Sequence, residues 1–142
     1  MRQIPLPKIA PRKAVIYSDG ASSGNPGPAG IGAVVIVDDE KETLSEAIGI
    51  TTNNVAEYTA LIRALELARK KGAEEIELYL DSELIVRQLK GIYRVKNKKL
   101  IPLYERVKEL LEGFCRVKIT HVPRELNKEA DALSKRALKK GI

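Results

Sequence analysis

Four acidic residues stand at positions from which a fold could bring them together. Asp19 and Asp81 each follow an apolar run typical of a buried strand, and Glu57 and Asp131 lie in segments with helical periodicity. Four carboxylates at one end of a sheet repel one another unless divalent cations neutralise them, and oxygen ligands favour Mg²⁺ or Mn²⁺ over zinc. Such a cluster suits two-metal displacement at phosphorus, in which one ion activates water and the other stabilises the leaving oxygen.

The stretch from 18 to 30 departs furthest from ordinary sequence composition. It holds four glycines and two prolines between two predicted strands, at residues 14–17 and 31–37. A hairpin with an Asx turn at Asp19 would be the simple explanation. So many special backbone residues favour a longer, tightly specified loop instead. We therefore expect Asp19 to lie where a rigid strand gives way to that loop.

Glu57 lies near the start of a predicted helix. If Asn54 is the N-cap, Glu57 completes a capping box and needs no other role. At about 100° per residue, however, Glu57 lies about 40° from Leu61 and about 20° from Ala64, on the buried side of the helix. A carboxylate directed toward the sheet needs a partner, and a metal site would supply one.

Asp81 and Asp131 also have structural alternatives. Asp81 could cap the helix that follows it, and Asp131 could pair with Lys135 one turn along. A right-handed helical crossover, however, would place the strands that end near Asp19 and Asp81 side by side and parallel. That end of an open α/β sheet is where ligands bind, so the two carboxylates are expected to meet there.

The remaining elements predict one mixed α/β domain, a sheet flanked by helices. Residues 1–13 have three prolines and no periodicity, so we expect a flexible basic extension there and the domain at 14–142. The strands are expected at 14–17, 31–37, 42–50, 75–80 and 115–121, with a turn at 38–41. The helices are expected at 51–71, 82–89, 98–111 and 125–140. The apolar line of the last helix is expected to be Leu126, Ala130, Leu133 and Ala137.

Composition limits the cofactor and the partners. The 142 residues include one cysteine, Cys115, which excludes an internal disulfide and a cysteine-based metal site. They also include one histidine, His121. A net charge of +6, with cations gathered at 1–13 and 93–99, suits a polyanion such as nucleic acid. No apolar run approaches the ~18 residues of a membrane span, and we expect a cytoplasmic monomer that does not bind membranes.

Four motifs, in this order and at this spacing, resemble type 1 ribonuclease H. They are Ser18 to Ala21 with Gly24 to Gly30; Asn53 to Glu57; Leu80 to Ser82; and His121 to Arg124 with Asn127, Ala130, Asp131 and Leu133. The resemblance covers residues 14–139. It implies a ribonuclease H-like fold, with a five-stranded mixed sheet of three antiparallel and then two parallel strands, and helices on both faces.

The resemblance also implies a function. It implies an endonuclease that cleaves the RNA strand of RNA–DNA hybrids, leaving 5′-phosphate and 3′-hydroxyl ends. The four carboxylates would hold two Mg²⁺ ions, with Mn²⁺ as a possible substitute: Asp19, Glu57, Asp81 and Asp131. Two alternatives remain open, a nuclease that also cleaves RNA–RNA duplexes and a binding module that has lost catalysis. All four carboxylates are present, which speaks against the second alternative.

Substrate contacts are implied by the same resemblance. The RNA 2′-hydroxyls would be recognised by Gly20, Ser22, Asn25, Asn53 and Glu57. The DNA phosphates would be bound by Thr52, Arg94, Asn97 and Lys98. Larger bacterial members carry an extra helix and a basic protrusion where this chain has only residues 91–97, so this is a compact form. Ile50 stands where many relatives have an arginine.

A cation near Asp131 is expected to assist catalysis. His121 matches the spacing of the family's mobile loop histidine, but Pro123 stiffens the chain directly after it and Arg124 is an alternative cation. A lone histidine at a strand end is more often structural. We therefore favour Arg124 over His121 for this role.

Overall fold

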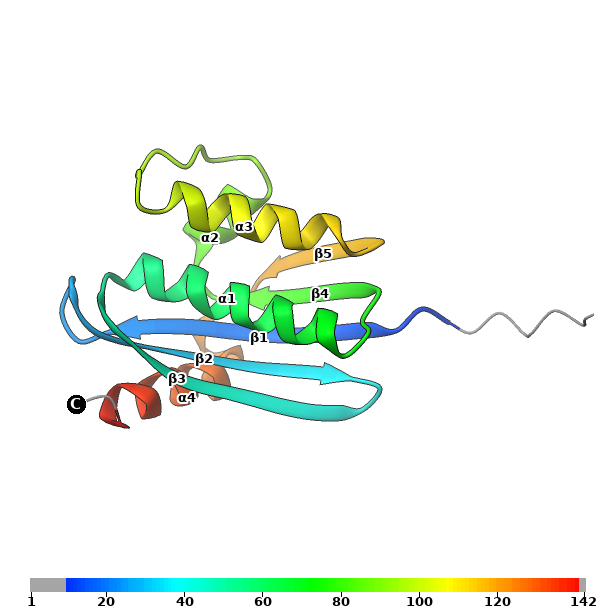
Figure 1. Ribbon diagram of the computed structural model, residues 1–142, viewed down its shortest axis with the longest axis horizontal. Coiled ribbons are helices and arrows are strands. Elements are labelled where there is room, and N and C mark those ends of the chain that lie inside the picture. The colour runs from blue at the N-terminus through cyan, green and yellow to red at the C-terminus, as the bar shows by residue number, and fades with distance from the viewer. Residues whose placement is uncertain (1–9, 141–142) are drawn as a thin grey trace, which may run out of the picture.

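A mixed sheet of five strands forms the centre of the structure (Figure 1). The computed structural model describes residues 10–140 of the chain. The strands are β1 (Lys13–Ser22), β2 (Gly27–Val37), β3 (Glu40–Thr51), β4 (Glu75–Leu80) and β5 (Arg116–His121). Their order is β3-β2-β1-β4-β5. The pairs β3·β2 and β2·β1 are antiparallel, and β1·β4 and β4·β5 are parallel. The predicted fold class is therefore confirmed.

Helices cover both faces of this sheet (Figure 1). They are α1 (Asn53–Lys70), α2 (Glu83–Leu89), α3 (Ile101–Glu112) and α4 (Lys128–Lys140), with a 3₁₀ turn, η1 (Arg124–Leu126), before α4. α1 and α3 lie over one face, and α4 lies behind β2 and β3 on the other. Among the described residues, no helix combines the length and the apolar character that crossing a bilayer requires.

The main core lies between the sheet and the helices on the α1 face. Ala14 and Ile16 of β1 are fully buried with Leu61 and Leu65 of α1, and Leu110 of α3 completes the same cluster. Burying one such large aliphatic side chain contributes about 1.5–3 kcal/mol. This packing holds α1 firmly on β1 and so fixes the height of its N-terminal turns above the sheet.

The glycine-rich stretch folds as a β-hairpin, and the prediction of a long loop was wrong. β1 continues to Ser22 and β2 begins at Gly27, so only residues 23–26 form the turn. Asp19 accordingly lies inside β1 and not at its end. Glycine here serves close packing more than unusual dihedral angles, because in this stretch only Gly24 has a positive φ, at 98°.

Two helices differ from their predicted ranges. α3 begins at Ile101 and not at 98, because the Asn97 side-chain oxygen accepts a bond from the Lys99 amide (2.9 Å) and holds a turn before the helix. The predicted last helix is divided into η1 and α4, and Leu126, expected in the core, is 63% exposed. The other residues of its predicted apolar line are buried: Ala130, Leu133 and Ala137.

The body of the domain begins slightly earlier than predicted. Lys13 already belongs to β1, and the Arg12 guanidinium lies 2.8 Å from the Asp38 carboxylate. The predicted flexible basic extension, 1–13, therefore contains residues that are held against the sheet. Its first part, 1–9, lies outside the described residues.

Candidate active site

Asp19 lies on β1 just past the point at which β4 stops pairing with it. The last residues paired between these parallel strands are Tyr17 and Tyr79, and β4 ends at Leu80. Beyond this point β1 pairs only with β2, so its other edge is open. Asp81 follows β4 directly. The predicted convergence of Asp19 and Asp81 is confirmed, and it arises from the difference in length between two neighbouring strands.

α1 brings Glu57 to this opening. The helix is capped by Thr52, whose Oγ1 accepts a bond from the Val55 amide at 3.3 Å. Glu57 is thus the fifth residue of the helix, which excludes the capping box that an Asn54 cap would have allowed. Glu57 instead lines the opening.

Asp81 is likewise not a helix cap. The residue that caps α2 is Ser82, whose Oγ accepts a bond from the Ile85 amide at 3.3 Å. Against the raising effect of burial, the Ser82 hydroxyl also lowers the pKa of the Glu57 carboxyl. The capping explanation for Asp81 therefore fails, and its neighbour Ser82 lines the cleft with Glu57.

α4 brings Asp131 to the cluster from the other face of the sheet. The side-chain amide of Asn127, just before α4, donates a bond to the Ser18 carbonyl (3.0 Å) and fastens the start of the helix beside Asp19. The alternative ion pair of Asp131 is present, with Lys135 Nζ 3.0 Å from Oδ2. Asp131 nevertheless lines the same cleft as Asp19 and, together with burial as the larger cause, raises the pKa of the Asp19 carboxyl, so the ion pair does not remove it from the cluster.

The four carboxylates meet in one cleft. Asp19, Glu57 and Asp81 each offer an oxygen, and these oxygens lie within 4.8 Å of one another. A cleft of about 390 Å³ opens over them and reaches Asp131. Its lining residues are Asp19, Gly20, Ala21, Asn53, Asn54, Glu57, Asp81, Ser82, Arg124, Asp131 and Lys135. The donor set is entirely oxygen, which suits a hard divalent cation.

Burial and mutual repulsion raise two of the pKa values strongly. Burial, and then the negative charge of Asp81, raise the pKa of Asp19 to about 8. The same two causes raise the pKa of Glu57 to about 7, although the Ser82 hydrogen bond and the Arg124 charge oppose the rise. Asp19 and Glu57 therefore ionise less readily than exposed carboxyl groups, and a divalent cation would favour their ionised forms.

Asp131 behaves in the opposite way. Burial alone would raise its pKa, but hydrogen bonds with Lys135 and Asp19, together with the charges of Lys135 and Arg124, lower its pKa overall. Asp131 therefore ionises more readily than Asp19, and two cations, Lys135 and Arg124, line the cleft with it.

Arg124 and His121 occupy different surroundings. Arg124 lines the cleft and opens η1, while His121 is exposed at the end of β5, where it pairs with Leu80, and is not among the cleft-lining residues. Position therefore favours Arg124 as the cation beside Asp131.

Three of the predicted RNA-contacting residues are hydrogen-bonded to one another. The amide and the hydroxyl of Ser22 both donate to Asn53 Oδ1, at 2.8 and 3.0 Å. The Asn53 amide in turn donates to Asn25 Oδ1 at 3.1 Å. The hairpin and the start of α1 form one unit beside the cleft, and Gly20 lines the cleft itself.

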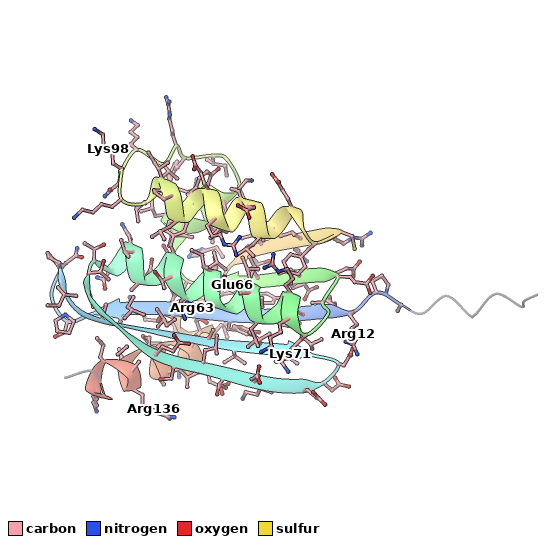
Figure 2. The ribbon with its side chains drawn as sticks, viewed as in Figure 1. Arg12, Arg63, Glu66, Lys71, Lys98 and Arg136 are labelled. Carbon is pink, nitrogen blue, oxygen red and sulfur yellow. The ribbon has the colours of Figure 1, made fainter. Side chains whose placement is uncertain are left out.

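The other predicted contacts lie apart from the carboxylates. Arg94, Asn97 and Lys98 belong to the segment between α2 and α3, and Figure 2 shows Lys98 on the side of this segment away from the sheet. Arg94 lines a separate hollow of about 470 Å³. The Asn97 side-chain oxygen accepts the bond that holds the turn before α3, so a phosphate would meet the side-chain NH2 donor of Asn97 and the cations of Arg94 and Lys98.

Lys135 and Ser82 are site residues that the sequence alone does not single out. Sequence reasoning gives Lys135 only as a surface partner of Asp131, and Ser82 only as the residue after a strand-end aspartate. A serine that both follows an acidic strand end and precedes a helix is the available signal for Ser82. The turn of α4 that links Asp131 to Lys135 is the signal for the lysine.

Comparisons with known proteins agree with this geometry. A family model described as reverse transcriptase-like matches residues 17–137. The chain is 46% identical over 129 residues to "Bifunctional protein Rv2228c" of Mycobacterium tuberculosis, covering 89% of this chain and 35% of that protein. It is 48% identical over 124 residues to "Ribonuclease HI" of Halobacterium salinarum, covering 86% and 62%. The solved structure of LC11-RNase H1 in complex with RNA/DNA hybrid has a TM-score of 0.83 at 43% identity, covering 89% and 97%.

The range matched by the family model, residues 17–137, contains the positions of all four carboxylates. The chain spans less than two thirds of the length of the two curated relatives named above. Within the matched span, the strand order and the helices on both faces have the same plan as the solved ribonuclease H1 structures. The chain therefore belongs to the type 1 ribonuclease H family.

Proposed function

We propose that this chain is an endoribonuclease that hydrolyses the RNA strand of RNA–DNA hybrids and leaves 5′-phosphate and 3′-hydroxyl ends. The observation that carries the proposal is the meeting of Asp19, Glu57 and Asp81 within 4.8 Å, with Asp131 beside them, in an open cleft. The hybrid bound by the similar LC11-RNase H1 supports the choice of substrate. One chain supplies all four carboxylates, so a monomer suffices.

The residues present fit two divalent cations, and we assign Asp19, Glu57, Asp81 and Asp131 as their ligands. Oxygen-only donors favour Mg²⁺, with Mn²⁺ as a substitute. Burial is the chief cause of the raised pKa values of Asp19 and Glu57. Bound ions would activate the attacking water and stabilise the leaving oxygen. Metal binding must displace the protons of Asp19 and Glu57, so affinity is expected to increase with pH.

Arg124 is proposed to stabilise negative charge on the phosphate. It lies on the cleft wall and acts electrostatically on both Glu57 and Asp131. An arginine stays charged at any accessible pH and presents several donors, which suits a phosphate whose charge grows in the transition state. His121 is the weaker candidate because it lies outside the cleft lining.

The RNA strand is proposed to lie along the unit formed by the hairpin and the start of α1. Gly20, Ser22, Asn25 and Asn53 would present backbone and amide groups to the 2′-hydroxyls, whose absence from DNA provides the discrimination. Their mutual hydrogen bonds order these groups before substrate arrives. Ordered groups lose less entropy on binding, which favours selective recognition.

The DNA strand is proposed to contact phosphate-binding groups on either side of the cleft. Thr52 caps α1, and the N-terminus of a helix favours an anion. Arg94 and Lys98 would extend this contact beyond the cleft. Ile50, close to Thr52, is 77% exposed and carries no charge. Binding of the DNA strand would therefore depend more on the residues between α2 and α3 than on this position.

Cleavage of end-labelled duplexes tests the proposal. RNA–DNA, RNA–RNA and DNA–DNA duplexes of one sequence are incubated with the protein and either Mg²⁺ or Mn²⁺, with Asp19→Asn as the control. We expect cleavage of the RNA strand of the hybrid alone. No cleavage with either ion, or equal cleavage by the Asp19→Asn variant, would overturn the assignment, and cleavage of RNA–RNA would change the substrate class.

A further inference from the structure

Two glycines flank Asp19 on opposite faces of the sheet. Gly20 follows it in β1, and Gly32 lies directly opposite it in β2. Side chains alternate between faces along a strand, and directly paired residues share a face. A β-carbon on Gly20 would therefore point to one face of the sheet, while the Asp19 side chain and a β-carbon on Gly32 point to the other face.

Gly20 lies against the helix that carries Glu57. A β-carbon built on Gly20 would overlap the peptide group between Ala56 and Glu57, and would lie 2.5 Å from the Ala56 carbonyl oxygen. The obstacle is backbone, which cannot rotate away as a side chain can. Only glycine lets β1 approach α1 this closely at the residue next to the Asp19 carboxylate.

Gly32 has the same relation to the helix that carries Asp131. A β-carbon on Gly32 would overlap the Ala130 carbonyl and would lie 2.5 Å from the Ser134 amide nitrogen and 2.7 Å from Leu133 Cβ. These residues form the turn of α4 that contains Asp131. The approach of α4 to the sheet at this turn is therefore also set by a missing side chain.

Backbone conformation does not explain either glycine. The glycines with positive φ in the described residues are Gly24, Gly49, Gly72 and Gly91, and neither Gly20 nor Gly32 is among them. An alanine could adopt their dihedral angles without strain. What these two positions require is the absence of a side chain between a strand and a helix.

We propose that Gly20 and Gly32 are positioning residues of the metal site, an inference that rests on the proposed function. They set how closely α1 and α4 approach β1, and thereby how far Glu57 and Asp131 reach toward Asp19. Ordinary contacts between carbon and other heavy atoms are about 3.5–4.0 Å, so a new β-carbon would push the helix or strand outward by about 1 Å. Functional constellations tolerate displacements of only about 0.5 Å.

Alanine variants of the full chain test this proposal through metal binding without nucleic acid. Mn²⁺ affinity is measured by calorimetry for Gly20→Ala and Gly32→Ala, beside unfolding in a chelator. Gly30→Ala is the matched control, because its β-carbon would lie 2.5 Å from the Ser134 carbonyl and 2.9 Å from Ala137 Cβ, against the same helix but farther along it from Asp131.

We expect both test variants to bind Mn²⁺ at least about tenfold more weakly than the wild type, the scale typical of lost support for metal ligands. The Gly30→Ala control is expected to lose comparable stability while its Mn²⁺ affinity changes less than about twofold. If Gly20→Ala is largely unfolded, its binding is measured in the cold with a stabilising osmolyte. Mn²⁺ affinities of the test variants equal to that of the control would show that both glycines serve packing alone.

A rescue experiment separates ligand reach from general loosening. In the Gly32→Ala background, Asp131→Glu lengthens the ligand by one methylene and is expected to recover at least about threefold of the lost affinity, whereas Asp131→Glu alone weakens binding. Additive losses in the double variant would overturn the proposal. Failure of the wild type to bind Mn²⁺ would instead refute the proposed function, and the inference with it.

Discussion

Replacing Asp19 by asparagine is expected to stabilise the metal-free protein at neutral pH while abolishing cleavage. The Asp19 residue is only 8% exposed and its carboxyl lies beside Asp81, Glu57 and Asp131. Ionising it without a cation costs free energy in the folded state that the unfolded chain does not incur. Asparagine keeps the shape of the side chain and removes the charge, so the folded state no longer bears this cost.

The magnitude is set by the pKa of Asp19, which burial and then the Asp81 charge raise from 3.8 to about 8. Between these values the folded protein binds more protons than the unfolded chain, so the free energy of unfolding falls as pH rises. At about 1.4 kcal/mol for each pH unit, the loss reaches roughly 4 kcal/mol at pH 7. Asp131 titrates jointly with Asp19 and has a lowered pKa, which offsets part of the loss, so we expect Asp19→Asn to gain about 2–4 kcal/mol at pH 7.

Urea unfolding followed by circular dichroism, in a chelator and at a series of pH values from about 4 to 9, measures this gain. The gain should be small near pH 4 and largest near pH 8. Added Mg²⁺ should stabilise the wild type alone and narrow the difference. Glu112→Gln, at the exposed end of α3, is the control and should change stability by less than about 0.5 kcal/mol. A destabilised Asp19→Asn protein at pH 7, or a gain independent of pH, would refute the electrostatic account.

Further predictions concern the cations around the site. Arg124→Ala should lower turnover on the hybrid by about 10- to 1,000-fold with little change in melting temperature, whereas His121→Ala should leave turnover nearly unchanged. The reverse pattern in stable variants would assign the catalytic role to His121 instead. Lys135→Gln should raise Mg²⁺ affinity, measured by calorimetry, by roughly two- to tenfold, because the ion no longer competes with an ammonium group 3.0 Å from the Asp131 carboxylate. Weaker Mg²⁺ binding would show that Lys135 orients the Asp131 carboxylate instead. Lys98→Ala should reduce the slope of log binding constant against log salt concentration for the hybrid by about one phosphate contact, without changing turnover at saturation. An unchanged slope would show that Lys98 does not contact the DNA strand.

The sequence predicted the part of the site that depends on local periodicity and chain direction. Asp81 ends a short alternating strand, and a right-handed crossover places that strand beside β1, which suffices to bring Asp81 near Asp19. The helical spacing of Glu57 relative to Leu61 placed it on the buried side of α1. These relations depend on periods of two and 3.6 residues, which survive small errors in element boundaries.

The sequence failed where contacts between distant elements decide the local structure. Glycine and proline composition favoured a loop around Asp19, but Gly20 and Gly32 are needed because helices touch the sheet there. The cap of α1 could be Thr52 or Asn54 on composition alone, and only the fold shows which side chain reaches the Val55 amide. Single-residue propensities do not contain this information.

The cleft itself results from two strand lengths. β4 has six residues and ends at Leu80, two residues before Ser82, the N-cap of α2. β1 continues for five residues past its last pairing with β4 because the hairpin partner β2 supports it. The edge of β1 from Ser18 to Ser22 is thus left without a strand beside it on the β4 side, and the carboxylates occupy that place. A longer β4 would fill the gap with backbone hydrogen bonds, and a shorter hairpin would remove Asp19 from the sheet. The fold therefore places charged groups where two strands separate, and repulsion among them is tolerated because α1 and α2 are held by the core on the α1 face and α4 packs on the other face through Ala130, Leu133 and Ala137.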